Sequence, residues 1–131
     1  MEDNFKLEII SPEKIIFSGE IKIIKIPSYE GDMSILKNHI PIITFLRPGI
    51  IKVVKKDDSS EEFFVEDGTI EFFNNTLTAL SASAKNIKNL SAEFISKLSK
   101  EVEDKLSKED LTDQDRYILN HKLDVLKEIR I

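Results

Sequence analysis

The alternation of apolar and polar residues changes its period once along the chain. From Phe5 to about Ala84, short apolar runs alternate with turn-forming residues, and in the first run Phe5, Leu7 and Ile9 share one face of an extended strand. The runs lie at residues 5–10, 14–17, 21–26, 34–36, 40–46, 50–56, 61–66, 69–73 and 76–82. We therefore predict an antiparallel β-sandwich of about nine or ten strands.

Turn-forming residues separate these runs. Ser18-Gly19 and Arg47-Pro48-Gly49 each interrupt an apolar stretch. Asp67-Gly68 predicts a β-hairpin most strongly, because a type I′ turn needs positive φ at both central residues. Asn74-Asn75 is expected to adopt the same geometry less readily.

Beyond Ala84 the pattern becomes helical. An apolar residue recurs every fourth position at Leu90, Phe94, Leu98, Val102 and Leu106. Ser91 is placed to cap this first helix, and Ser107 to Leu111 breaks it. A capping box over Thr112–Asp115 then starts a second helix, whose broad apolar face holds Ile118, Leu119, Leu123, Val125, Leu126 and Ile129.

The fold class that follows is β + α: a sandwich over residues 1–84 and an antiparallel helical hairpin over residues 85–131. Because the other helix faces are densely charged, we expect the hairpin to bury one seam against itself. We also expect it to hold weakly to the sandwich, or to move relative to it, as a mobile regulatory unit.

Composition excludes several classes of protein. A chain of 131 residues with 40% apolar content is large enough for a core, which argues against disorder. The net charge of −5 argues against nucleic acid as a partner. With no cysteine, disulfides and thiolate metal sites are excluded. No secretory signal and no membrane-spanning run is found, so we expect membrane association only through another protein.

Two arrangements that would carry chemistry are weakly supported. A catalytic reading makes His39 a base oriented by Glu30 or Asp32, but no motif supplies a nucleophile, and Ser34 and Thr44 stand in ordinary settings. A metal reading needs His39 to meet His121, which lies in the other half of the chain. We therefore predict no catalytic residue, no metal and no cofactor.

Two surfaces are better candidates for binding. The loop Tyr29-Glu30-Gly31-Asp32 places an aromatic residue beside two carboxylates, a combination common in protein interfaces. Lys122, Lys127 and Arg130 on the last helix form either a solvated face or a contact for an acidic partner. The residues alone leave both readings open.

Three segments in order resemble one family. "KLEIISPEKIIFSGEI", "EGDMSILKNHIPIITFLRPGIIKV" and "FFVEDGTIEFFNNTLTALSASA" are similar to the three conserved segments of the epsilon subunit of bacterial and chloroplast F-type ATP synthases. The second resembles that family's E-G-[DE]-x-G-[IV]-L-P-G-H-A-P signature. The resemblance covers the whole chain, including the order of sandwich and hairpin.

The resemblance implies a non-catalytic rotor subunit of the central stalk, which couples proton-driven rotation of the c ring to ATP synthesis. Glu30, Gly31 and Asp32 match the loop that faces the c ring, and Ser11, His39 and Thr44 match positions that dock the gamma subunit. Lys122, Lys127 and Arg130 are expected partners for an acidic loop of the catalytic beta subunit when the hairpin extends toward the alpha/beta hexamer. Whether the hairpin inhibits ATP hydrolysis stays open. The expected location is the cytoplasmic face of the bacterial inner membrane.

Two departures from the family pattern matter. Lys37-Asn38 replaces the usual Pro-Gly, and Asn is the next best residue for a positive φ, so we expect the turn to persist. At the start of the first helix, Ser91 and Phe94 replace the Asp and Arg with which some members bind ATP. We therefore predict that the chain does not bind ATP there.

A rival from another class is a free-standing β-sandwich binding module with a self-associating hairpin. Sugar-binding sandwiches usually offer aromatic platforms, whereas this chain has no Trp and only Tyr29 and Tyr117. The scarcity of such residues disfavours the rival.

Overall fold

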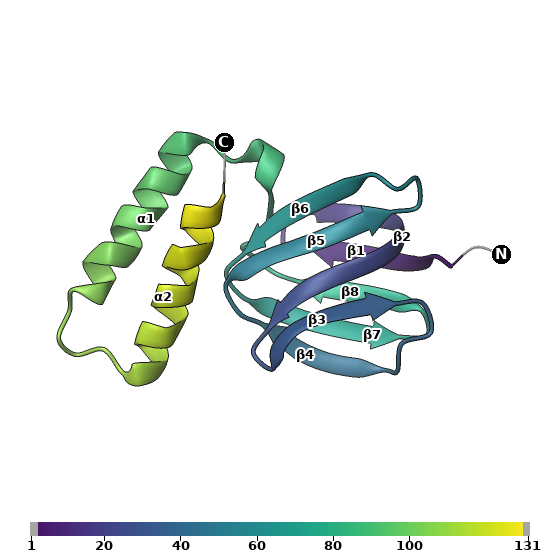
Figure 1. The fold of residues 1–131 in the computed structure, drawn as a ribbon, viewed down its shortest axis with the longest axis horizontal. Coiled ribbons are helices and arrows are strands. Elements are labelled where there is room, and N and C mark those ends of the chain that lie inside the picture. Colours follow the sequence, from purple (N-terminus) through teal and green to yellow (C-terminus); the bar gives the residue numbers. More distant parts are fainter. Residues whose placement is uncertain (1–2, 130–131) are drawn as a thin grey trace.

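Nine strands and two helices make up residues 3–129, the part of the chain that the computed structural model describes (Figure 1). The strands are β1 (Phe5–Ile10), β2 (Ile15–Ser28), β3 (Gly31–Leu36), β4 (Ile42–Leu46), β5 (Gly49–Lys55), β6 (Ser60–Val65), β7 (Gly68–Phe73), β8 (Thr76–Leu80) and β9 (Lys85–Asn86). A 3₁₀ turn (Ile87–Asn89) leads into α1 (Ala92–Leu106) and α2 (Asp113–Glu128). The predicted sandwich followed by a helical hairpin is confirmed.

The sandwich has two layers that share one strand. The first layer has the order β1-β8-β7-β4, and the second has the order β3-β2-β5-β6-β9. Strand β2 pairs with β1 through its first half and with β3 through its second half. The pairing is antiparallel except between β1 and β8, which run parallel. The layers are therefore joined by continuous backbone.

The prediction of a turn at Ser18-Gly19 is wrong. Both residues lie inside β2, where Ser18 pairs with Glu8 and Gly19 with Leu7 of β1. The two apolar runs on either side are one long strand. Because β1 supplies ladder partners throughout, two residues of low strand propensity are held extended by their tertiary context.

The prediction of a hairpin at Asp67-Gly68 is also wrong. Strand β6 before it pairs with β5 and β9, whereas β7 after it pairs with β4 and β8, so this segment crosses between layers. The tight hairpin lies instead between β7 and β8, where Asn74 and Asn75 have φ of 52° and 56°. Positive φ at both central residues is the geometry of a type I′ turn.

The core lies between the layers and follows the strand period of two. Alternate residues such as Phe5, Leu7 and Ile9 of β1 are fully buried. On β6 the neighbours Phe63 and Phe64 are both buried but in different clusters, Phe63 in the sandwich core and Phe64 against the helices. The second layer is therefore covered on both of its faces at this point.

The helices begin where the sequence predicts. The Ser91 hydroxyl accepts a hydrogen bond from the backbone N–H of Phe94 at 3.0 Å. Thr112 and Asp115 form a reciprocal capping box at the start of α2. Each bond satisfies an N–H group that the first helical turn leaves without a partner.

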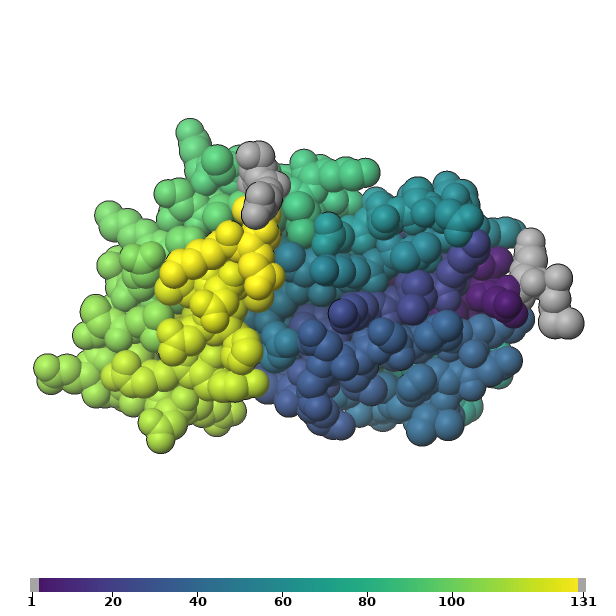
Figure 2. Space-filling model, viewed as in Figure 1, coloured from purple at the N-terminus to yellow at the C-terminus, as the bar shows by residue number. Residues whose placement is uncertain are grey.

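The hairpin packs on itself and on the second layer. One apolar cluster contains Val102 of α1, Val125 and Leu126 of α2, and Phe64 of β6. Figure 2 shows α2, in yellow, lying directly against the blue and teal surface of the sandwich. In this conformation the hairpin is docked, and the apolar contact between its two helices continues onto Phe64 of the sheet.

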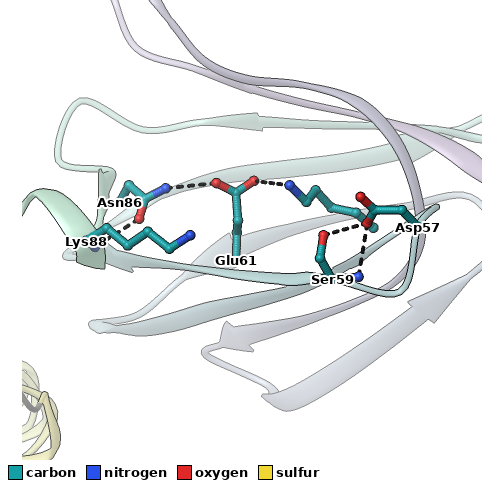
Figure 3. A network of polar contacts seen from close by, with 6 residues as sticks. Asp57, Ser59, Glu61, Asn86 and Lys88 are labelled. Atoms are coloured by element: carbon teal, nitrogen blue, oxygen red, sulfur yellow. Dashed lines mark hydrogen bonds and ion pairs between the residues drawn. The ribbon is translucent and has the colours of Figure 1, made fainter.

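The segment that leads into the hairpin is tied to the sheet edge by a polar network (Figure 3). The Glu61 carboxylate accepts a hydrogen bond from Asn86 Nδ2 at 3.1 Å and lies 3.4 Å from the Lys55 ammonium. Asn86 also accepts from the backbone N–H of Lys88 at 3.0 Å. In the neighbouring turn, hydrogen bonds from Ser59 lower the pKa of Asp57. Because β9 pairs with β6, the sheet itself extends two residues beyond the predicted boundary at residue 84.

Candidate partner-binding surfaces

The acidic loop joins β2 to β3 and projects from one end of the sandwich. Gly31 has φ of 117°, a conformation that disfavours any residue with a side chain. The Ser28 hydroxyl accepts from the backbone N–H of Glu30 at 3.1 Å, which leaves the Glu30 side chain exposed. The backbone geometry of this loop therefore leaves the Glu30 carboxylate exposed to solvent.

The two carboxylates of this loop differ in their setting. Asp32 accepts a hydrogen bond from Arg47 Nη2 at 2.6 Å and forms an ion pair with it. Arg47 Nη1 also donates to the carbonyl of Pro48 at 3.0 Å, which fixes the guanidinium. Asp32 thus braces the loop against the β4–β5 connection, while Glu30 projects beyond it.

Tyr29 lines the same hollow as Gln114 of the docked hairpin. The residue is 42% exposed. Partial burial, the carboxylate of Asp67 and the phenol of Tyr117 on α2 raise the pKa of Tyr29 above its ordinary value. The loop therefore lies within electrostatic reach of α2.

Two of the three residues predicted to dock gamma lie at the surface in turns. Ser11 is half-buried, and its hydroxyl donates to the carbonyl of Lys14 at 3.1 Å in the β1–β2 turn. His39 follows Asn38, whose φ of 68° confirms the expected turn. The His39 ring packs edge-on against Phe72, with ring centroids 5.8 Å apart, and its Nδ1 lies 2.7 Å from the Ile40 carbonyl oxygen.

Thr44 is placed differently. It is only 3% exposed, and its hydroxyl lies 2.8 Å from that of Ser28, in a buried hydrogen bond between β4 and β2. A direct contact from this side chain to a partner does not fit the structure. Its role here is to join the two layers at the base of the acidic loop.

Several apolar side chains are exposed on the outer face of the first layer, around the exposed Glu71 of β7. On β4 the residues on either side of Thr44, Ile43 and Phe45, are 67% and 60% exposed. Phe73 of β7 and Leu80 of β8 are 63% and 51% exposed. Phe45 pairs with Thr69, which pairs in turn with Leu80, so these apolar residues lie across neighbouring strands of one face. We call Ile43, Phe45, Phe73 and Leu80 the apolar face.

The sequence did not predict this face, because β4 carries apolar residues on both of its sides. In IITFL, the buried set is Thr44 and Leu46, and the exposed set contains Ile43 and Phe45. An alternating pattern identifies the outer face only when one phase is polar. Thr44, as the polar residue, would ordinarily point outward.

A hollow of about 870 Å³ adjoins the apolar face. Its lining includes Ser11, Tyr29, Phe45 and Leu80 from the sandwich and Gln114 from α2. Ser11 and the apolar face are therefore parts of one continuous surface, and the docked hairpin supplies part of its wall.

The basic residues of the last helix are separated by the structure. Lys122 pairs with Glu66 of the sandwich, while Lys127 is exposed. Arg130 lies outside the described residues. The pairing of Lys122 was not predicted, because nothing in the sequence near Glu66 indicates a contact with a residue more than fifty positions later.

The two histidines lie in separate surroundings. His39 packs on Phe72 of the sandwich, whereas His121 packs on Tyr117 of α2, with ring centroids 4.4 Å apart. Between residues 3 and 129, no group of three or more His, Cys, Asp or Glu side chains is arranged to hold a metal. Over the same residues, neither helix has the length and apolar character needed to cross a bilayer.

At the start of α1, Phe94 is half-buried, and the Lys85 ammonium lies 5.3 Å from its ring centroid. This is a cation–π contact within the chain. It ties the segment that follows the sandwich to the first turn of the helix.

Comparison with known proteins identifies the family. The family described as "ATP synthase, Delta/Epsilon chain, beta-sandwich domain" matches residues 4–87. The ATP synthase epsilon chain of Pelagibacter ubique is 44% identical over 130 residues, which cover 98% of this chain and 99% of the relative. That of Parvibaculum lavamentivorans is 34% identical over 99% of this chain and 98% of the relative.

Solved structures support the fold at low sequence identity. A chain of the Euglena gracilis mitochondrial ATP synthase, in a structure of its OSCP, F1 and c ring, matches with a TM-score of 0.76 and 18% identity, over 95% of this chain and 78% of that one. A chain of the Tetrahymena thermophila central stalk and c ring matches with a TM-score of 0.63 and 16% identity, over 94% and 93%. From the matched sandwich and the full-length relatives together, this chain belongs to the ATP synthase delta/epsilon family, with the epsilon chains.

Proposed function

We propose that this chain is a central-stalk rotor subunit of a proton-translocating F-type ATP synthase, without an active site of its own. It would couple rotation of the c ring to ATP synthesis from the cytoplasmic face of the bacterial plasma membrane. Membership of the epsilon chains over nearly the full length supports this assignment.

The observation that carries the proposal is the apolar face with its adjoining hollow. Large exposed apolar patches in a monomer mark interaction sites. Here Ser11 lines the hollow and Phe45 belongs both to the hollow and to the face. We assign this surface to the gamma subunit. His39 would contribute at its edge, whereas Thr44 would support docking from below through its bond to Ser28.

The acidic loop is the proposed contact for the c ring. The exposed Glu30 carboxylate would meet basic groups of the ring, and Gly31 would permit the turn that presents it. Asp32 would act partly through Arg47, since its carboxylate is already paired. Electrostatic attraction of this kind guides orientation and raises the association rate more than it raises affinity.

The hairpin is the proposed regulatory part. When it extends along gamma toward the alpha/beta hexamer, Lys122, Lys127 and Arg130 would face acidic groups of the catalytic beta subunit. In the docked conformation Lys122 instead contacts Glu66. Inhibition of ATP hydrolysis would therefore require the hairpin to leave the sandwich.

The test places a charge on the apolar face. We expect Phe45→Asp and Ile43→Asp to reduce recovery of gamma with the tagged protein from detergent-solubilised membranes at least tenfold, because a buried unpaired carboxylate at an interface costs several kcal/mol. Leu36→Asp is the matched control, since Leu36 is 52% exposed on β3 of the other layer. Equal recovery of gamma with all three variants would refute the assigned surface. Failure of the wild-type protein to bring gamma at all would refute the rotor assignment.

A further inference from the structure

Glu71 places a carboxylate in the middle of the apolar face. It is exposed on β7, and it pairs in register with Ile43 of β4 on one side and with Thr78 of β8 on the other. Phe73 follows on the same side of β7. Opposed residues of an antiparallel pair have Cβ atoms about 5 Å apart, so this carboxylate lies among apolar side chains.

The chain supplies no cation for this carboxylate. Within residues 3–129, Glu71 takes part in no ion pair. Glu8 of β1 lies in the same cross-strand row, because it pairs in register with Thr78. The Glu8 carboxylate lies 3.8 Å from the ammonium of Lys6. Of these two carboxylates, only that of Glu71 has its charge left for a group from outside the chain.

A hollow of about 460 Å³ adjoins the Glu71 side chain. Its lining consists of Pro41, Ile42, Ile43, Glu71, Phe72 and Phe73. Among the described residues that form it, Glu71 is the one that carries a charge. Apolar walls with a single carboxylate suit a side chain that has an apolar stem and a cationic tip. Lysine and arginine have this form, since their methylene groups pack on apolar surface while the charge stays at the end.

A partner that covers the apolar face changes the surroundings of Glu71. The carboxylate leaves water, and a carboxylate buried without a partner opposes binding. A basic group of the partner at this point offsets that cost with a charge-assisted hydrogen bond. The surface therefore fits a partner that is apolar over most of its contact area and carries a cation opposite Glu71.

We propose that Glu71 and its hollow receive a basic side chain of the gamma subunit, which enters between Ile43 and Phe73. This proposal rests on the proposed function, because it takes gamma as the occupant of the apolar face. The apolar residues supply contact area, and Glu71 determines specificity. An apolar surface without a cation at the matching point leaves the carboxylate unpaired and is rejected.

The proposal is tested by measuring how tightly the tagged full-length protein binds ATP synthase from which this subunit has been removed. We expect Glu71→Gln to weaken binding roughly tenfold or more, because the basic group of gamma loses its counter-charge in the docked complex. Glu71→Leu should weaken binding at least as much, although it enlarges the apolar surface. Binding of Glu71→Leu as tight as that of the wild type, or tighter, would show that Glu71 is only a solvated charge.

Glu8→Gln is the matched control, because it removes a carboxylate of the same row that Lys6 already pairs. Its binding should stay within about twofold of the wild type. Thermal melting of each variant checks the fold, and an exposed position such as Glu71 should change the melting temperature little. Equal losses of binding in Glu8→Gln and Glu71→Gln would contradict a specific role for Glu71.

Charge exchange tests the partner group. Glu71→Arg should weaken binding more than Glu71→Gln, since it opposes two cations. Each Lys and Arg of gamma is then replaced by Glu in turn, and we expect one of these changes to restore the binding of Glu71→Arg roughly tenfold or more. If none restores it, gamma offers no cation to Glu71 and the proposal is wrong.

Ile43→Asp separates this proposal from the proposed function. If Ile43→Asp weakens binding while Glu71→Gln and Glu71→Leu do not, gamma docks on the apolar face and only the role of Glu71 falls. If none of the three weakens binding, the assigned surface falls together with this proposal. Failure of the wild-type protein to bind at all would refute the rotor assignment itself.

Discussion

Gly49, at the start of β5, is required by what lies opposite it rather than by its backbone conformation. A Cβ atom at this position would lie 2.5 Å from Cβ and 2.7 Å from Cγ of Pro27. Pro27 belongs to β2, which leads into the acidic loop. The close approach of two backbones thus positions the loop, and a rigid proline ring offers little room to adjust.

We predict that Gly49→Ala lowers the free energy of unfolding by about 1–3 kcal/mol, because an added methyl group overpacks this contact. Denaturation in urea, followed by circular dichroism, measures the change. Gly19→Ala is the control, since the nearest atom to its Cβ would be 3.6 Å away in Phe17. If the two variants lost the same stability, close packing against Pro27 would not explain Gly49.

The conformation of a single residue was predicted well where its own backbone preference determines it. The direction of a side chain was predicted poorly where packing against another strand determines it. Asn38 adopts the expected positive φ, because a short amide side chain tolerates that conformation. Thr44 turned inward because Ser28 supplies a buried hydroxyl partner from another strand. No pattern within β4 contains that information.

At the scale of elements, the first turn of α1 carries Ser91 and Phe94 at the positions where the ATP motif implied by the family resemblance has Asp and Arg. Ser91 caps the helix with its own hydroxyl, and the Lys85 ammonium lies over the Phe94 ring. The cation in this place comes from the chain itself. The Ser91 hydroxyl and the Lys85 ammonium are thus both engaged by groups of the chain itself.

We predict that the isolated protein shows no saturable binding of ATP at millimolar concentration by titration calorimetry. A family member that keeps the Asp and Arg of the ATP motif serves as the positive control. Binding that disappeared on substitution of Ser91 to Ile95 would contradict the prediction.

Element boundaries were predicted from turn residues, and these succeed only when the chain returns to the same layer. Asn74-Asn75 closes a hairpin between paired strands. Asp67-Gly68 has the better turn composition but leads from one layer to the other. Turn chemistry reveals that the chain changes direction, and the topology decides which strand it meets next.

At the scale of the whole molecule, the buried apolar residues form two separate clusters, and only the second contains residues of the hairpin. Ala84 is the last residue of the sandwich core, and β9 adds edge pairing through Asn86. On the sheet side, the cluster shared with the hairpin contains Phe64 of β6 and the partly buried Ile50 of β5. The proposed division near residue 84 therefore separates two packing units.

We predict that a chain ending at Asn86 folds cooperatively and still binds gamma, with a melting temperature within a few degrees of the full-length protein. Calorimetry and co-purification measure these two properties. A chain ending at Leu80 is the control and should be clearly less stable, since it lacks Ala84 and β9. Loss of folding in the longer chain would mean that the hairpin completes the core.

The shared strand β2 has a mechanical consequence for a part that turns under load. Its 14 residues run from the layer that carries the apolar face to the loop at Glu30, with ladder partners in both layers. A pull along this strand loads many hydrogen bonds at once, in shear, whereas peeling would break them one after another. If the loop is the c-ring contact, as proposed, torque applied there would be distributed over the strand pairings of both sheets.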